Sequence, residues 1–581
     1  MFGGHTMATR TLITLLGIIL ILAVACGTAE APDPTAVATA EPTTAPTGGE
    51  TSQPTATPQA AAPPAEVEVF PGELKIMVGD FASERFSVGF SLGLAGDLNY
   101  GRILHGFLIS DNEQREMVPG IASDWNLSDD GLTWTFTIRE GVKWHDGSEI
   151  TPEDVHWTFQ HLFGPEAVEH LIAPTAIRLS READRIELNG RDVSLTTTIP
   201  ATYVGNTLSE SGTGWYHVMP ARDELYNEDV EVAYDQNPIG AGPMSFVEHV
   251  RASSMTFERF DDYYYQPENG FPEDKRVNFE RLTLYLVPEE STRVSALRAG
   301  EADIAPISLV SREQVEAGGG RVVFGQEGAF VWVPMMGCWA DESFPCYKKE
   351  FRQALNYAID KELIRDRLYG GPDEFQVKGW AAVTPSTIGY TPEIDPFPYD
   401  PDKARQLLAD AGYPGGEGAG KIILHTWQST SMPFQTEAAQ LAAEFWRRDL
   451  GLDVEVRVGD STAIRGAWAA GELNSQIIWR DNETRVDATS TTVSGYADAA
   501  SEIRRSEDPE LRRLAQEASQ TVDEEERAQA LAELYPLLRD ESYEIGIGYA
   551  NIPWGVGPSV ETWEPYPLSP NISALHTITL K

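Results

Sequence analysis

Two groups of residues have types and spacings that could serve catalysis. Gly89-Phe-Ser91-Leu-Gly93 fits the pattern Gly-x-Ser-x-Gly, in which a strained turn presents a serine as a nucleophile. No clear strand leads into this segment, so we interpret the match as accidental. His145 and Asp146 could form a charge dyad, but Gly147 follows them directly, which favours a turn.

The histidines give no support to a metal site. His156 and His161 are five residues apart on an expected helix, close to the i,i+4 spacing that metals favour but not on it, and no third ligand accompanies them. The sequence also has no Walker A motif and no HExxH motif. We therefore expect no enzyme activity, no metal and no cofactor.

The N-terminus has the features of an export signal. Arg10 supplies a positive charge, and residues 11–25 form an uncharged run that is short of the ~20 apolar residues of a membrane-spanning helix. The run ends in Leu22-Ala-Val-Ala-Cys26, which resembles a bacterial lipobox. We expect residues 1–26 to be a lipoprotein signal peptide and Cys26 to carry the lipid. Cleavage of an ordinary signal is the alternative.

Residues 27–66 are nearly all Ala, Pro, Thr, Gly and acidic residues. Such a segment has nothing to pack into a core, so we expect a disordered tether between the lipid and a folded body. An exported chain meets an oxidising compartment, where Cys338 and Cys346 would form a disulfide across a short loop. Closing this loop would stabilise the fold by roughly 2–3 kcal/mol. A zinc site is less favoured, because no neighbouring His or second Cys pair has the spacing it requires.

Charge and length narrow the class of protein. Asp and Glu outnumber Lys and Arg by 89 to 44, which gives a formal net charge of −45. Like charges would repel phosphate groups, so nucleic acid and anionic lipid surfaces are poor partners. Acidity suits cationic solutes, but a need for solubility explains it equally well. A chain of 581 residues also exceeds one core, so we expect two or three lobes.

Helices and strands alternate along the body. Residues 132–138 alternate apolar and polar residues, which predicts a half-buried strand. Thr151 and Pro152 then start a helix. Further apolar stripes predict helices at 351–359, 400–411, 438–446 and 523–538, and a strand at 452–458. This alternation favours an α/β architecture.

An ordered set of motifs resembles the family 5 extracellular solute-binding proteins of ABC transporters, which bind dipeptides, oligopeptides and nickel. The motifs are Pro119–Trp125, Gly131–Arg139, Gly141–Gly147, Thr151–Val155, Gly240–Pro243, Ser291–Asp303, Phe351–Asp360 and Tyr399–Leu408. The resemblance implies a class C (type II) periplasmic-binding-protein fold with two lobes, a hinge and an extra domain. By order, lobe I would comprise 67–112, 236–330 and 541–581, with 113–235 inserted as domain II and 331–540 as lobe III.

The resemblance also implies a site. In peptide-binding members, an acidic residue shortly after a Gly-Trp segment pairs with the amino terminus of the peptide. Here Asp481 would be that cationic anchor and Trp479 a wall against the solute, although Ile478 replaces the glycine and the spacing is shorter. A core position for Trp479 and a solvated or paired Asp481 is the alternative. Arg480 and Arg485 could instead bind a carboxylate or phosphate.

We therefore expect an extracytoplasmic, lipid-anchored protein of an ABC importer, which captures a solute and delivers it to permease subunits without doing chemistry itself. A peptide is the favoured solute, and a monomer the favoured state. The alternatives are a ligand-sensing receptor of the same fold and an extracellular hydrolase that uses Ser91.

Overall fold

The computed structural model describes residues 72–87, 95–165, 167, 174–212, 216–222, 231–429, 432–501 and 503–581. Residues 68–581 belong to one compact unit. Cys26 and Ser91 lie outside the described residues. Within the described ranges, no helix is long and apolar enough to cross a membrane.

The largest sheet has nine strands, in the order β17-β12-β18-β11-β1-β10-β9-β8, with β13 paired to β18. Strand β1 is parallel to β10 and β11, and the other pairs are antiparallel. The alternate residues Leu74, Ile76 and Val78 of β1 are buried, as the period of a strand with one buried face requires. The strands are β1 (Glu73–Val78), β8 (Met244–Val250), β9 (Ser254–Arg259), β10 (Arg281–Leu286), β11 (Ile304–Pro306), β12 (Arg321–Pro334), β13 (Phe375–Gln376), β17 (Arg480–Glu483) and β18 (Glu544–Val556).

A second, antiparallel sheet has four strands in the order β4-β5-β7-β6: β4 (Ala122–Leu127), β5 (Thr133–Ile138), β7 (Asp192–Thr197) and β6 (Ala183–Asn189). Trp134, Phe136 and Ile138 point into the core, which confirms the alternation predicted for 132–138. Helix α2 (Pro152–Phe163) packs on this sheet and begins with the predicted cap. The Thr151 hydroxyl accepts from the Asp154 backbone amide, and the Asp154 carboxylate accepts from the Thr151 amide.

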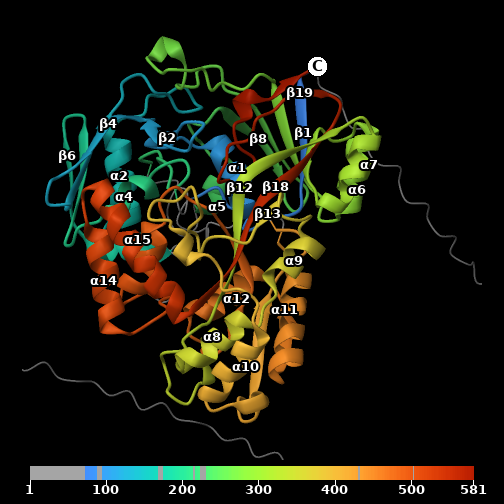
Figure 1. The fold of residues 1–581 in the computed structure, drawn as a ribbon. Coiled ribbons are helices and arrows are strands. Elements are labelled where there is room, and N and C mark those ends of the chain that lie inside the picture. The colour runs from blue at the N-terminus through green and yellow to red at the C-terminus, as the bar shows by residue number, and fades with distance from the viewer. Residues whose placement is uncertain are drawn as a thin grey trace, which may run out of the picture. The chain divides into compact units, whose positions relative to one another are not determined.

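A third sheet is parallel and has three strands in the order β15-β14-β16. It lies at the bottom of Figure 1 with α8, α10, α11 and α12. The helices expected at 400–411 and 438–446 and the strand expected at 452–458 are confirmed. The helix expected at 351–359 is present, but it begins and ends two residues earlier than expected. The elements are α8 (Lys349–Tyr357), α10 (Pro401–Asp410), β14 (Lys421–Thr426), α11 (Gln435–Leu450), β15 (Asp453–Val458), α12 (Ser461–Ala469) and β16 (Ile477–Ile478).

Strands β12 and β18 connect the nine-stranded sheet with the region of the three-stranded sheet. They pair from Arg321↔Val556 to Pro334↔Glu544, and Met335 then bridges to Ile477 of β16. Their register shifts between Gly325 and Ala329, and again between Val331 and Trp332. The expected lobe boundary at residues 330 and 331 falls inside β12.

Two helices near the C-terminus, α14 (Pro509–Gln520) and α15 (Glu524–Glu541), lie beside α2 and α4 (Val204–Thr207) in Figure 1. Thr202 donates a hydrogen bond to the carbonyl of Ser519 on α14. Leu531 and Tyr535 of α15 belong to the same buried cluster as Trp134. These helices come from the segment assigned by order to lobe III, and they pack against the segment assigned to domain II.

Candidate functional site

Strand β17 carries the residues singled out from the sequence. Its four residues pair with β12, from Ala329↔Glu483 to Trp332↔Arg480, and β12 is its only neighbour among the described strands. β17 is therefore an edge strand. Side chains alternate along it, so Arg480 lies on one face and Asp481 and Glu483 lie on the other.

Asp481 is half-buried and accepts a hydrogen bond from the Ser429 hydroxyl, with 3.0 Å between the oxygens. Tyr369 lies near it: burial, Asp481 and Glu437 raise the pKa of this phenol. The Tyr369 ring is 6% exposed and stacks on Phe375 at 4.7 Å between centroids. A carboxylate on an edge strand beside an aromatic ring suits an ammonium group, and the anchoring role of Asp481 stays a prediction.

Trp479 lies in the core. Its side chain is 0% exposed and belongs to the same cluster as Trp446 and Ile477, while its backbone amide donates to the carbonyl of His425. The ring therefore lies in the core, which was the alternative position expected from the sequence. In this conformation it presents no surface to a solute, and its role as a wall of the site stays a prediction.

Arg480 is 9% exposed and lies between two indoles. The central carbon of its guanidinium is 5.4 Å from the ring centroid of Trp332 and 5.8 Å from that of Trp427. Its Nε donates to the carbonyl of Asp481. Burial, together with the guanidiniums of Arg465 and Arg505, lowers its pKa below the usual value, although Asp481 opposes this.

Arg505 and Glu544 form a buried ion pair on the same face. Nε of Arg505 lies 2.5 Å from Oε1 of Glu544, and the Tyr496 hydroxyl donates to Oε2 at 3.3 Å. Burial raises the pKa of Glu544 while Arg505 lowers it. The Arg505 guanidinium also stacks over Trp468 at 4.6 Å. The charge of Glu544 is thus engaged by Arg505.

Arg485, the second arginine expected beside Asp481, follows β17. It is half-buried, and burial lowers its pKa. Its Nη1 donates to the hydroxyl of Thr491 at the start of the 489–497 helical turns. The structure therefore places Arg485 in a partly buried polar contact with Thr491.

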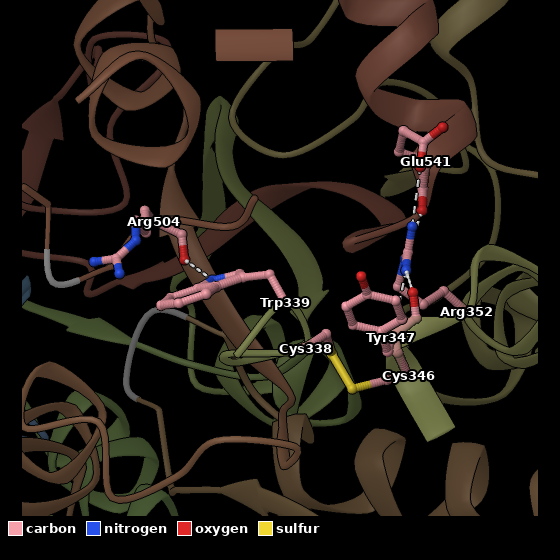
Figure 2. The surroundings of a disulfide bond; sticks show 7 residues. All are labelled: Cys338, Trp339, Cys346, Tyr347, Arg352, Arg504 and Glu541. Atoms are coloured by element: carbon pink, nitrogen blue, oxygen red, sulfur yellow. Dashed lines mark hydrogen bonds and ion pairs between the residues drawn. A yellow bond between two sulfur atoms is a disulfide. The ribbon is translucent and has the colours of Figure 1, made fainter. Parts of the chain in front are cut away.

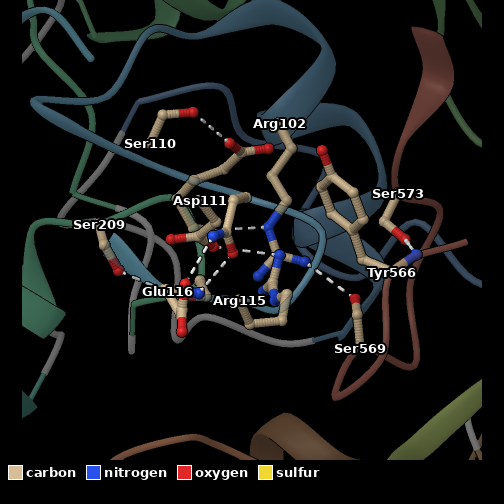
Figure 3. Close-up of polar contacts among 12 residues, drawn as sticks. Arg102, Ser110, Asp111, Arg115, Glu116, Ser209, Tyr566, Ser569 and Ser573 are labelled. Atoms are coloured by element: carbon tan, nitrogen blue, oxygen red, sulfur yellow. Dashed lines mark hydrogen bonds and ion pairs between the residues drawn. The ribbon is translucent and has the colours of Figure 1, made fainter. Parts of the chain in front are cut away.

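Glu483 connects β17 to helix α1 (Ala95–Leu104). Its Oε1 lies 3.3 Å from Nη2 of Arg102, and the two side chains are only 9% and 5% exposed. Arg102 also donates to the carbonyl of Glu210 and to the hydroxyl of Ser569 (Figure 3). One arginine thus ties the edge strand to three distant parts of the chain.

A cavity of about 50 Å³ lies beside Arg102. Its polar lining includes Glu210, Lys275, Tyr566 and His576. The Asp111–Arg115 ion pair of Figure 3 lies nearby, with 3.1 Å between the charged atoms. Burial raises the pKa of Asp111 to about 6 although Arg115 lowers it. A space of this size is large enough to hold water.

The disulfide (Figure 2) begins three residues after Met335, which bridges to β16 of the three-stranded sheet. Cys338 and Cys346 are joined with their Cα atoms 5.2 Å apart. The indole of Trp339 donates to the carbonyl of Arg504, and Arg352 donates to the carbonyls of Cys346 and Glu541. The short loop therefore contacts the segment that carries Arg505.

His145 has a structural role. His145 accepts a hydrogen bond at Nδ1 from the amide of Gly240, and its Nε2 is 3.0 Å from the carbonyl of Gly242. Gly147 adopts φ 84°, which confirms the predicted turn. No group of three or more His, Cys, Asp or Glu side chains in the described ranges is arranged to hold a metal ion.

Sequence reasoning missed most of the neighbours of β17. Trp332 comes from β12, Trp427 follows β14, Trp468 belongs to α12, and Arg505 precedes α14. No spacing links these residues, because the folded structure brings them together from four parts of the chain. The one local signal was the Arg480-Asp481 dipeptide itself.

Comparison with known proteins identifies the family of the chain. The family model described as bacterial extracellular solute-binding proteins, family 5, matches residues 116–501. Heme-binding protein A of Haemophilus influenzae is 25% identical over 455 residues, which cover 75% of this chain and 79% of that protein. The dipeptide-binding protein of Escherichia coli is 24% identical over 52% of this chain and 56% of its own length.

Solved structures share the fold. The dipeptide-binding protein of Pseudoalteromonas sp. SM9913, in complex with Met-Leu, has a TM-score of 0.72 at 19% identity and covers 88% of this chain and 100% of its own. The oligopeptide-binding protein AppA of Bacillus subtilis, in complex with a nonapeptide, has a TM-score of 0.69 at 19% identity, covering 88% and 99%. These proteins have the two-lobed α/β fold of periplasmic binding proteins. The chain therefore belongs to the bacterial extracellular solute-binding proteins of family 5, the binding proteins of ABC importers.

Proposed function

We propose that this protein captures a peptide outside the membrane and delivers it to an ABC permease. The observation that carries the proposal is the edge strand β17 with a carboxylate on it. An extended peptide can add to such an edge through main-chain hydrogen bonds, and Asp481 would pair with its terminal ammonium group.

Capture of this kind also needs a conformational equilibrium. A solute shifts that equilibrium only if it contacts the closed form better than the open one. β17 pairs with β12, and Glu483 of β17 contacts Arg102 of α1. A solute bound along the strand would therefore lie close to groups from both elements. Lipid attached to Cys26 would hold the protein at the membrane, with residues 27–66 as a tether.

A thermal-shift screen of the purified protein tests the proposal. The panel contains peptides, oligosaccharides, cationic amines and nickel chelates. A ligand at 100 times its Kd stabilises the native state by about 2.7 kcal/mol, which gives a measurable rise in unfolding temperature. We expect the rise with peptides. A rise with another class alone would replace peptide by that class as the solute.

The anchor is tested with Asp481→Asn. Loss of the charge should weaken binding of a free-amine peptide by about 10-fold or more, as expected for a charge-assisted hydrogen bond, and should leave its N-acetylated form unaffected. Asp453→Asn, at an exposed position on β15, is the matched control. Equal affinities of the wild-type protein and the Asp481 variant for every bound peptide would remove Asp481 from the site.

A further inference from the structure

A cavity of about 120 Å³ lies where the end of α3 (Pro174–Glu182) meets residues 199–203, the helical turn Val493–Ala497 and helix α14. Its described lining contains no residue of β17. A closed apolar cavity of ~150 Å³ binds benzene, so a space of this order is sufficient for a small ring or a branched chain. The cavity is therefore a candidate for a second binding site.

The first wall of the cavity is fixed to the four-stranded sheet. The amide of Ala201 donates to the carbonyl of Gly131, and the indole of Trp134 donates to the carbonyl of Ala201. The hydroxyl of Thr197 donates to the carbonyl of Ile199. These bonds hold the backbone of the segment in place, so the wall is kept from moving inward to fill the space.

The opposite wall is the turn Val493–Ala497, which is π-helical. Turns of this kind are rare and are frequent at functional sites. The hydroxyl of Tyr496 donates to Glu544 of β18, and the side-chain amide of Gln516 on α14 donates to the carbonyl of Ala497. The two walls are thus fixed to different elements. Atoms that line an unfilled space lose contacts, and a ligand that fills the space restores them.

The charged groups at the cavity are paired. Asp498 accepts from Nη2 of Arg181 at 2.9 Å. Oε2 of Glu182 accepts from the hydroxyl of Tyr203, and Oε1 lies 3.9 Å from Nε of Arg178. Among the residues that the structure describes, none donates a hydrogen bond to Oε1 of Glu182. The cavity therefore offers one open acceptor and no unpaired charge.

Apolar side chains form most of the remaining lining. Val493 and Ala497 are buried, whereas Ile199 and Ala499 are exposed. The exposed pair marks the side on which the cavity opens to solvent, and the buried pair marks its floor. A ligand that enters here meets apolar groups on both sides and the carboxylate of Glu182.

We propose that this cavity binds a small molecule with an apolar body and one hydroxyl group, the class of phenol and the branched alcohols. The hydroxyl donates to Oε1 of Glu182, and the apolar body lies between Ile199 and Ala497. The ligand thereby joins the 199–203 segment to the C-terminal helices. This inference does not rest on the proposed function, because the lining does not include the edge strand.

Calorimetry on the purified protein tests the inference with phenol and fluorobenzene. The two rings have nearly the same size and shape, but only phenol can donate a hydrogen bond. We expect phenol to bind about 10-fold more tightly, as for a hydrogen bond to a charged group. Equal affinity for fluorobenzene would overturn the role of Glu182 as the acceptor.

Two substitutions that fill the cavity locate the binding. Ile199→Trp adds a large ring at the opening, and Ala497→Leu adds bulk at the floor. Both variants should lose phenol binding. Neither should unfold at a lower temperature than the wild-type protein without ligand, because filling a cavity stabilises a fold. If Ala497→Leu failed to fold, Ile199→Trp would decide the question, since its position is 40% exposed.

Val250→Trp on β8 is the matched control, because Val250 is similarly exposed at 45% and does not line the cavity. It should bind phenol like the wild-type protein. Phenol binding that persists in Ile199→Trp and in every folded cavity variant would place the ligand elsewhere and overturn the inference. Absence of phenol binding by the wild-type protein would overturn it as well.

Discussion

At the scale of single residues, His145 and Gly240 belong to motifs of the family and have structural roles. His145 is held neutral mainly by burial, which lowers its pKa, and its Nδ1 accepts a hydrogen bond from the amide of Gly240 while its Nε2 faces the carbonyl of Gly242. Protonation of Nδ1 would place a proton against the amide of Gly240. Gly240 itself touches the end of α1: a Cβ there would lie 1.9 Å from the carbonyl oxygen of Leu104.

The acid stability of the protein should therefore depend on His145. Burial lowers its pKa from 6.5 to about 4. Because the folded pKa lies below the unfolded one, the contribution of His145 to stability is complete above pH 6.5 and is lost as the pH falls through 4. The loss amounts to about 3 kcal/mol at most.

Urea unfolding at pH 7 and pH 4.5 measures this effect. His145→Gln should be less stable than the wild-type protein at pH 7, and its free energy of unfolding should fall less between the two pH values. His156→Gln, at a half-buried position on α2, should keep the wild-type slope. A wild-type slope in His145→Gln would show that other groups govern acid unfolding.

At the scale of elements, the link between α1 and β17 depends on one ion pair. Arg102 and Glu483 are both nearly enclosed, so removing one partner leaves a buried charge. Glu483→Gln should lower the free energy of unfolding by about 3 kcal/mol. The carbonyl of Glu210 and the hydroxyl of Ser569 keep two of the hydrogen bonds of Arg102.

A double-mutant cycle isolates the pair. Arg102→Met combined with Glu483→Gln should be more stable than the sum of the single effects predicts, because neither charge is then left alone. Arg185→Met removes a pair with Glu187 in which both side chains are more than half exposed, and should change stability little. Strictly additive effects at Arg102 and Glu483 would show that the two side chains act independently.

The disulfide loop should also contribute to the stability of the fold. Replacing both Cys338 and Cys346 by Ser should lower the free energy of unfolding by roughly 2–3 kcal/mol, since the unfolded chain is no longer constrained. Reductant should lower the unfolding temperature of the wild-type protein towards that of the double variant. If reductant had no effect on the wild-type protein, the bond would make no contribution to stability.

At the scale of the whole molecule, the sequence predicted the individual strands and helices that local patterns encode. Alternation gave the strand at 133–138, and capping residues gave the starts of α2 and α10, because these signals act over a few residues. The partners of Arg480 could not be predicted, since Trp332 meets it only when β12 and β17 pair, and Trp427 follows the end of β14. The packing of α14 against the segment around Thr202 escaped prediction for the same reason.

The pairing of β12 with β18 has a consequence for biosynthesis. The ribosome completes β12 at Pro334 but does not reach Glu544, its partner, until more than two hundred further residues have been made. During that interval the apolar run Ala329–Val333 lacks its partner strand β18 along one edge. An uncovered apolar strand is prone to pair with other chains. The nascent protein therefore has an uncovered apolar strand from residue 334 until residue 544 has been made, and a truncated chain that stops before residue 544 keeps that strand uncovered.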